Sequence, residues 1–274
     1  MSVKSKSHGM RLPTLRFRAK IVLGFSAVLA ILAVSMALAY LGFERVANAV
    51  SSYRGSVAEA DLVRTVDREL ISYQGLARTY TLTGTDADEA ATHSIEESLR
   101  ASIDRSVTAA IAPERREQLA RLQAQFHSFA KLFGEIVTLT RANNKIASEE
   151  LNDAGSKIQF KFDDLGDTAA LTNAAADQAA IKDVTSQSLS VTTSVSAFTV
   201  RPELKAADGI LGRIRFLTTS VGAISSDDQK ITQWASDIGG LLKRYRASFA
   251  KFVENANAIA KRKAEPQFLH CRKH

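Results

Sequence analysis

The chain has little of what disulfide-bonded or β-rich folds require. Its only cysteine is Cys271, so no disulfide framework is possible and the folded part must be held together by packing alone. Proline occurs four times and glycine fourteen times in 274 residues, so few positions interrupt regular structure. Aromatic residues make up only 7%, whereas alanine, leucine and serine are abundant. This composition favours long helices over strands and predicts an all-α fold.

Sequence motifs of the common enzyme classes are also missing. The chain contains no G-x-S-x-G, no Walker phosphate loop, no G-x-G-x-x-G and no H-E-x-x-H. Its histidines show no ligand spacing, and Cys271 lacks the C-x-x-C-H context of covalent haem. The histidines are His8, His93, His127, His270 and His274. We therefore expect no enzymatic activity, no cofactor and no metal site.

Basic residues outnumber acidic ones, giving a formal net charge of +7, but the excess lies at the two ends of the chain. Residues 1–20 carry six basic side chains, and residues 261–274 carry five against one acid. The remaining residues hold 25 basic and 28 acidic side chains. Because a nucleic-acid-binding protein needs a basic face on its folded domain, nucleic acid is not an expected partner.

One long apolar run lies near the N-terminus. Residues 21–41, IVLGFSAVLAILAVSMALAYL, contain no charged side chain, and about 20 such residues cross a bilayer core as one helix. The basic residues before the run have no acidic neighbour, which predicts a cytoplasmic N-terminus and an exported remainder. They are Lys4, Lys6, Arg11, Arg16, Arg18 and Lys20. We expect a single-pass protein of the inner, cytoplasmic membrane whose folded domain lies in the periplasm.

A cleaved signal peptide is the alternative to a membrane anchor. Ala37-Leu38-Ala39 fits the small-residue pattern of a cleavage site. The apolar region of a signal peptide is typically about 7–15 residues long, however, and this run is longer. Its length favours an uncleaved anchor. With either interpretation, the rest of the chain is exported.

The pattern beyond the apolar run is helical. From residue 42 to residue 83, apolar side chains recur at steps of three and four residues, which is typical of one face of a helix. They are Val46, Val50, Tyr53, Val57, Ala60, Val63, Val66, Leu70, Tyr73, Ala77 and Tyr80. Gly84 should end this helix, and Thr85-Asp86-Ala87-Asp88 should form a capping box for the next one, to about Ile111.

Four further helical stretches are expected after that. Pro113 lies where a long helix can begin, since proline costs nothing in a first turn. We expect a break in this helix at residues 152–155 and a resumption up to Val200. A short helix should follow Pro202, and Ser225-Ser226-Asp227-Asp228 should cap a last helix reaching about Lys261.

Two pairs of similar strings lie about 120 residues apart. HSFAKLF at residues 127–133 resembles ASFAKFV at 247–253, and TYTL at 79–82 resembles AFTV at 197–200. This spacing is far too large for a solenoid repeat. We interpret it as two related helical modules, residues 42–145 and 151–261. Chance agreement between short alanine-rich helical strings is the alternative.

Several arginines lie near the expected helix ends. Arg64 and Arg68 are four residues apart at the border of the apolar stripe, and Arg78 follows close to Tyr80. In the second module Arg201, Arg213 and Arg215 flank the corresponding turn. Guanidinium groups bind carboxylates in a bidentate manner, most strongly where water is excluded. The pattern is compatible with an anion site.

Ordinary surface ion pairs explain the same residues equally simply. Asp61, Asp67 and Glu69 are close enough in the sequence to pair with the first two arginines. Exposed pairs of this kind are common and contribute little. For each arginine taken alone, a solvated helix face is the simpler explanation. The case for an anion site depends on the three cations of the first module meeting near one groove between helices.

The strings RLPTLRFRAKIVLGF, ADLVRTVDREL, ARTYTLTGTDADEA and RASFAKFVENANAI carry a resemblance to a known family. Together with the anchor and the duplicated helical modules, they resemble the sensory half of a bacterial methyl-accepting chemotaxis receptor. More narrowly, the chain is similar to the helical bimodular sensor class, in which two four-helix bundles stack on one another. The resemblance covers about residues 11–260 and depends on pattern and short strings.

The resemblance implies a function for the exported domain. Receptors of this family bind small organic acids or related metabolites between the helices of one or both bundles, and they usually act as dimers. Carried over to this sequence, the anion-binding positions are Arg64 and Arg68, with Arg78 and Tyr80 in support and Arg201 and Arg213 as counterparts in the second module. The expected partners are thus a small carboxylate, the membrane, and a second copy or a related receptor.

The C-terminal end departs from the family pattern. After Lys261-Arg262-Lys263 the chain reads AEPQFLHCRKH, with no second apolar span and no signalling coiled coil. We interpret residues 262–274 as an atypical tail of a truncated or frame-shifted receptor, or of a fragment. Two other functions remain open: a helical rod that modulates full-length receptors by pairing with them, and the sensor region of a histidine kinase or a cyclic-dinucleotide enzyme.

Overall fold

A computed structural model describes residues 17–171 and 175–265, and every regular element within those ranges is a helix. The all-α prediction is therefore confirmed. The chain divides into two units, residues 1–64 and residues 65–274. Helix α1 (Phe17–Thr83) contributes to both of them.

The first unit contains the apolar run. In the described part of the chain, α1 is the one helix that is long and apolar enough to cross a membrane, and its apolar window is not buried in the structure. Past this window, α1 exposes further apolar side chains in steps of four and three residues. These are Val46, Val50, Tyr53 and Val57, with 61, 45, 71 and 42% of each residue exposed.

The second unit begins with a core formed by three helices. The C-terminal part of α1, α2 (Asp86–Ala109) and α3 (Pro113–Lys145) surround the buried side chains of the first core. Tyr73 lies at its centre, with its ring centroid 5.2 Å from that of Phe129 and 6.1 Å from that of Phe133. The first core comprises Val66, Tyr73, Ala77, Tyr80, Leu99, Ile103, Phe126, Phe129, Phe133, Ile136 and Val137.

The turn between α1 and α2 follows the local sequence closely. Gly84 has a φ of +62°, a left-handed conformation that glycine adopts without strain, and it ends α1 as predicted. Thr85 is the N-cap of α2, where its hydroxyl oxygen accepts a hydrogen bond from the Asp88 backbone N–H at 3.2 Å. The predicted capping interaction is confirmed.

Helix α3 continues without a turn into the second half of the unit. It passes through a π-helical segment, η1 (Ile146–Asn152), into α4 (Asp153–Ala170). The break predicted at residues 152–155 is therefore wrong. The glycine there does not interrupt the helix: Gly155 lies inside α4 and packs beside Tyr245, whose ring would be 3.7 Å from a Cβ at this position, an ordinary contact distance. The irregularity is the wide π turn just before it.

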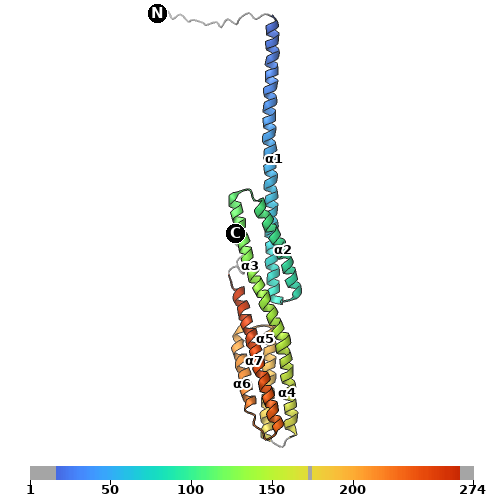
Figure 1. Cartoon of the computed structure of the whole chain (residues 1–274), viewed down its shortest axis with the longest axis vertical. Helices are drawn as coiled ribbons and strands as arrows, with labels where there is room; N and C mark the ends of the chain where they lie inside the picture. Colours follow the sequence, from blue (N-terminus) through green and yellow to red (C-terminus); the bar gives the residue numbers. More distant parts are fainter. Residues whose placement is uncertain (1–16, 172–174, 266–274) are drawn as a thin grey trace, which may run out of the picture. The chain divides into compact units, whose positions relative to one another are not determined.

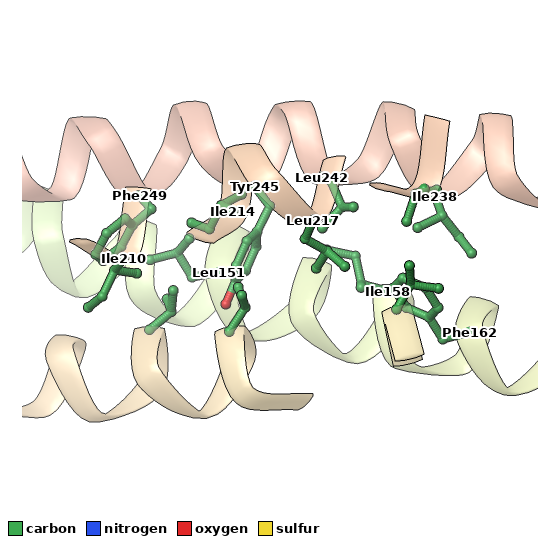
Figure 2. Packing of buried hydrophobic residues seen from close by; sticks show 14 of the residues in the cluster. Leu151, Ile158, Phe162, Ile210, Ile214, Leu217, Ile238, Leu242, Tyr245 and Phe249 are labelled. Carbon is green, nitrogen blue, oxygen red and sulfur yellow. The ribbon is translucent and has the colours of Figure 1, made fainter. Parts of the chain in front are cut away.

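Four helices enclose the second core. They are α4, α5 (Ala175–Val200), α6 (Ala207–Gly222), which follows the short 3₁₀ segment η2 (Leu204–Ala206), and α7 (Gln229–Lys263) (Figure 1). Figure 2 shows their apolar side chains meeting between the helices, among them Ile158, Ile214 and Leu242. The uninterrupted helix predicted from residue 155 to Val200 is wrong, because α4 ends at Ala170 and α5 begins at Ala175.

The last turns of α7 reach the first core. Ile259 packs against that core, and the Asn143 side chain of α3 donates a hydrogen bond to the Phe252 carbonyl oxygen at 3.3 Å. The Lys263 ammonium donates to the Thr81 carbonyl oxygen at 2.7 Å. Three helices and one helix end thus surround the first core, whereas four helices surround the second. The prediction of two stacked four-helix bundles is not confirmed.

Candidate functional site

The arginines predicted on α1 lie on exposed surface. Arg64 pairs with Asp61, with 3.5 Å between Nη1 and Oδ1, and 82% of its side chain is exposed. Arg68 and Arg78 are also exposed. Their backbone carbonyl oxygens accept hydrogen bonds from the hydroxyl groups of Ser72 and Thr81, respectively. An exposed pair of this kind stabilises a helix by a few tenths of a kcal/mol at most, roughly 0.3–0.5 kcal/mol. The positions of Arg64, Arg68 and Arg78 thus fit ordinary solvated residues on a helix surface.

Tyr80 differs from the arginines because it is buried. Only 1% of the residue is exposed, and its ring lies edge-on against Phe133, with the centroids 5.5 Å apart. Burial raises the pKa of the Tyr80 hydroxyl, and the negative charge of Glu89 raises it further. The hydroxyl makes no hydrogen bond of ordinary geometry within the described part of the chain. Tyr80 is therefore a core residue that carries an unsatisfied polar atom.

The two arginines predicted in the second module are also exposed. Arg201 directly follows α5, and its backbone N–H donates to the Ala197 carbonyl oxygen at 3.1 Å. Arg213 lies on α6. Neither of them lines either of the cavities beside the second core that are described below.

An ion pair with a buried carboxylate, which the sequence did not reveal, joins α2 to α3. Arg141 holds Glu89 in a bidentate arrangement, with Nη2 at 2.7 Å from Oε1 and Nε at 2.9 Å from Oε2. Only 7% of the glutamate side chain is exposed, whereas 64% of the arginine side chain is. Glu89 lies in the first turn of α2, where the positive end of the helix dipole favours a carboxylate.

A second carboxylate lies two turns further along α2. Glu96 accepts a hydrogen bond from the Tyr73 hydroxyl at 3.2 Å and pairs with Arg100 at 3.0 Å. The His93 imidazole lies between the two carboxylates, with nitrogens 3.6 Å from Glu89 and 3.7 Å from Glu96. The Arg100 guanidinium also lies over the Phe126 ring, 5.6 Å from its centroid. We name this set, Tyr73, Glu89, His93, Glu96, Arg100 and Arg141, the polar layer.

The polar layer fixes two guanidinium groups at the surface of the first module. Its carboxylates are largely buried, and each holds an arginine whose side chain is about half exposed (Arg100, 49%) or more (Arg141, 64%). Such an arrangement can present cations to an incoming anion without losing the internal pairing. No group of three His, Cys, Asp or Glu side chains among the described residues could hold a metal ion.

Cavities between described residues lie beside the second core, and two of them are large enough for a small molecule. One, of about 520 Å³, lies between η1 and α7, where the Ser248 hydroxyl donates to the Glu150 carboxylate at 2.5 Å. The other, of about 690 Å³, lies between α4 and α5. Both volumes fall within the range of small-molecule sites, about 300–1,000 Å³.

Comparison of the chain with protein-family models, with curated proteins and with solved structures finds no match.

Proposed function

We propose that the chain is a membrane-anchored sensor domain that binds a small organic anion outside the membrane. The observation that carries this proposal is the composition of α1. The same helix contains the apolar window and, towards its C-terminal end, four buried residues of the first core, Val66, Tyr73, Ala77 and Tyr80. A ligand that changes the packing of this core acts on the helix that carries the apolar window. Binding can shift the equilibrium only by its difference in affinity for the two states.

The anion-binding residues are proposed at two places in the first module. Exposed arginines that already hold a carboxylate are arranged for anion binding, which favours Arg100 and Arg141 of the polar layer. Arg64 and Arg68, which the family resemblance implies, are the second place. The only ion pair of Arg64 among the described residues is the long, exposed one with Asp61. Exchange of Asp61 for a ligand carboxylate therefore costs little free energy at Arg64.

Calorimetric titration of the full chain in lipid nanodiscs tests this proposal. A panel of mono-, di- and tricarboxylates is titrated into wild type, Arg100→Ala, the double variant Arg64→Ala/Arg68→Ala, and Arg246→Ala. Arg246 is an exposed arginine of α7 that serves as the matched control. We expect saturable binding of at least one acid, weakened tenfold or more in one of the first two variants and unchanged in the control. No binding by wild type, or equal binding by all variants, contradicts the proposal.

A structural partner function is the second candidate, and the exposed stripe on α1 favours it. Val46, Val50, Tyr53 and Val57 follow the four–three spacing of a coiled-coil seam, and water surrounds them in the isolated chain. The membrane holds all copies of the chain in one orientation, so two such stripes can meet in parallel. Val50→Cys in a Cys271→Ser background should then form a disulfide-linked dimer in membranes. Arg45→Cys, off the stripe, should not. Equal cross-linking of the two variants would contradict the seam.

A further inference from the structure

The helix that runs from α3 through η1 into α4 contributes to both cores. Phe129 and Phe133 of α3 are buried in the first core. Ile146 and Leu151, at the start and near the end of η1, are buried in the second core. Successive residues of an α-helix lie about 100° apart around its axis, so on an unbroken α-helix Ile146 would lie about 140° around from Phe133. The same helix must therefore present different faces to the two cores.

The π turn of η1 makes this change of face possible. Ile146 and Leu151 are five residues apart, a step that would leave them about 140° apart on an α-helix. In a π-helix each hydrogen bond spans five residues instead of four, so side chains five residues apart lie on one side. Beyond η1 the buried residues Ile158, Phe162 and Leu165 return to steps of four and three. Segment η1 therefore holds one residue more than a regular α-helix would.

Two side-chain hydrogen bonds attach this region to α7. The Asn143 amide donates to the Phe252 carbonyl oxygen at 3.3 Å. The Ser248 hydroxyl donates to the Glu150 carboxylate at 2.5 Å, and both residues line the cavity of about 520 Å³ between η1 and α7. The first contact is incomplete, because the buried Oδ1 of Asn143 accepts no hydrogen bond from the described residues. The attachment therefore leaves room for η1 to rearrange.

An identical residue lies next to each of these two contacts. Asn144 follows Asn143, and Glu149 precedes Glu150. If the extra residue moves along the helix towards α3, Asn144 takes the place of Asn143 and gives up its 3.3 Å hydrogen bond to the Gly84 carbonyl oxygen. If it moves towards α4, Glu149 takes the place of Glu150. A shift by one residue in either direction therefore keeps an asparagine and a glutamate directed at α7.

We propose that η1 is an adjustable joint between the two cores, in which the extra residue moves along the helix between neighbouring positions. A π turn bends a helix, so a shift by one residue turns the direction of the bend by about 100°. The two cores then change their orientation relative to each other, on the microsecond-to-millisecond timescale of helix register shifts. This movement needs no ligand, so it is tested independently of the proposed anion binding.

Deletion of Glu149 removes the extra residue and should leave a regular α-helix that still serves both cores. By circular dichroism of the full chain in nanodiscs, we expect its thermal midpoint to lie within about 3 °C of that of wild type. Deletion of Lys131, an exposed residue in a regular part of α3, is the matched control. It turns Phe129 by about 100° relative to Phe133 and should lower the midpoint by about 10 °C or more. Equal losses in the two deletions would overturn the proposal.

Hydrogen exchange of the same proteins tests whether the joint moves. In wild type, the amides of residues 146–152 should exchange at least about tenfold faster than those in the regular turns of α3 and α4 on either side. Deletion of Glu149 should slow them to the rate of those turns. Exchange in wild type that is as slow as in the flanking turns would contradict a moving joint.

Distances between two spin labels test whether the cores change orientation. The labels are attached to Ala124→Cys on α3 and Arg215→Cys on α6, both at exposed positions, in a Cys271→Ser background. We expect the chain with the complete η1 to give two or more distances, and the Glu149 deletion to give one narrow distribution. Distributions of equal width with and without Glu149 would show that η1 is a fixed turn and not a joint.

Discussion

Lys263, near the end of α7, donates a hydrogen bond from its ammonium group to the carbonyl oxygen of Thr81, near the end of α1, at 2.7 Å. A cation here satisfies a carbonyl that the helix itself leaves free and complements the negative end of the helix dipole. Next to it, Arg262 Nε lies 2.6 Å from Glu135 Oε2 on α3. Two adjacent residues of α7 therefore attach the helix of the second core to both long helices of the first.

Removal of this ammonium group should loosen the attachment. We expect Lys263→Ala to lower the free energy of unfolding by about 1 kcal/mol, because a helix-terminal hydrogen bond to a cation is lost. Hydrogen exchange of the last three turns of α7 should also become faster. Lys261→Ala, an exposed lysine of the same helix, serves as the control. Identical exchange in both variants would show that the Thr81 contact does not hold α7.

The Glu89–Arg141 pair should behave as a unit. Arg141→Met leaves the largely buried carboxylate of Glu89 without its arginine partner. We expect this to lower the free energy of unfolding by about 2 kcal/mol. This is less than the roughly 3–5 kcal/mol of a fully buried pair, because much of the arginine is exposed. The double variant Glu89→Gln/Arg141→Met should recover part of that loss. Thermal unfolding of the four combinations measures the coupling, and strictly additive effects would contradict it.

Gly84 should not tolerate a side chain. Its φ of +62° is unfavourable for alanine, and a Cβ at this position would lie 3.1 Å from the Thr140 Cγ2. We expect Gly84→Ala to lower the free energy of unfolding by about 1 kcal/mol or more. Gly134→Ala, at a helical glycine with open space, should instead be neutral or stabilising. Equal thermal midpoints for the two variants would contradict the structure of this turn.

Alkaline pH should destabilise the domain through its buried tyrosines. Burial raises the pKa of Tyr73, Tyr80 and Tyr245, with a further contribution from Glu96 at the first and from Glu89 at the second. A raised folded-state pKa contributes stability that is fully present below the unfolded value of about 10 and is lost as the pH rises through the folded value. The free energy of unfolding should therefore fall above about pH 10.

The decline should be shallower in Tyr245→Phe, which removes one of the three ionising groups. Urea unfolding at a series of pH values measures the slope, and absorbance at 295 nm reports tyrosinate. Ionisation of all five tyrosines near pH 10 while the helical signal persists would contradict the burial of Tyr73, Tyr80 and Tyr245.

Local sequence was enough for the helix ends that depend on neighbouring residues. Gly84 ends α1 through its left-handed backbone conformation, and Thr85 caps α2 with its own side chain. Both effects act within one helical turn, so the sequence predicts both helix ends. The π segment η1 was not predicted from the sequence, and it lies where one continuous helix passes from the first core to the second. The turn after Ala170 also escaped prediction, since no proline or glycine marks it.

In the candidate site, too, the sequence indicates contacts between near neighbours but not contacts between distant residues. The i,i+4 spacing of Glu89 with His93 and of Glu96 with Arg100 is visible in the sequence and could have indicated half of the polar layer. Arg141 lies 52 residues from Glu89, so only the folded chain brings them together. The sequence instead emphasised Arg64 and Arg68, whose spacing on one exposed helix face carries no information about burial.

The most direct test of the account is the side of the membrane on which the helical domain lies. In a Cys271→Ser background, Ser225→Cys places a thiol in the exposed turn between α6 and α7, and Ser5→Cys places one before the apolar run. A membrane-impermeant maleimide is applied to intact spheroplasts and to lysed ones. Membrane anchoring with an exported sensor predicts labelling of Ser225→Cys in intact spheroplasts and of Ser5→Cys only after lysis. The reverse pattern, or protection of both thiols until lysis, would contradict it.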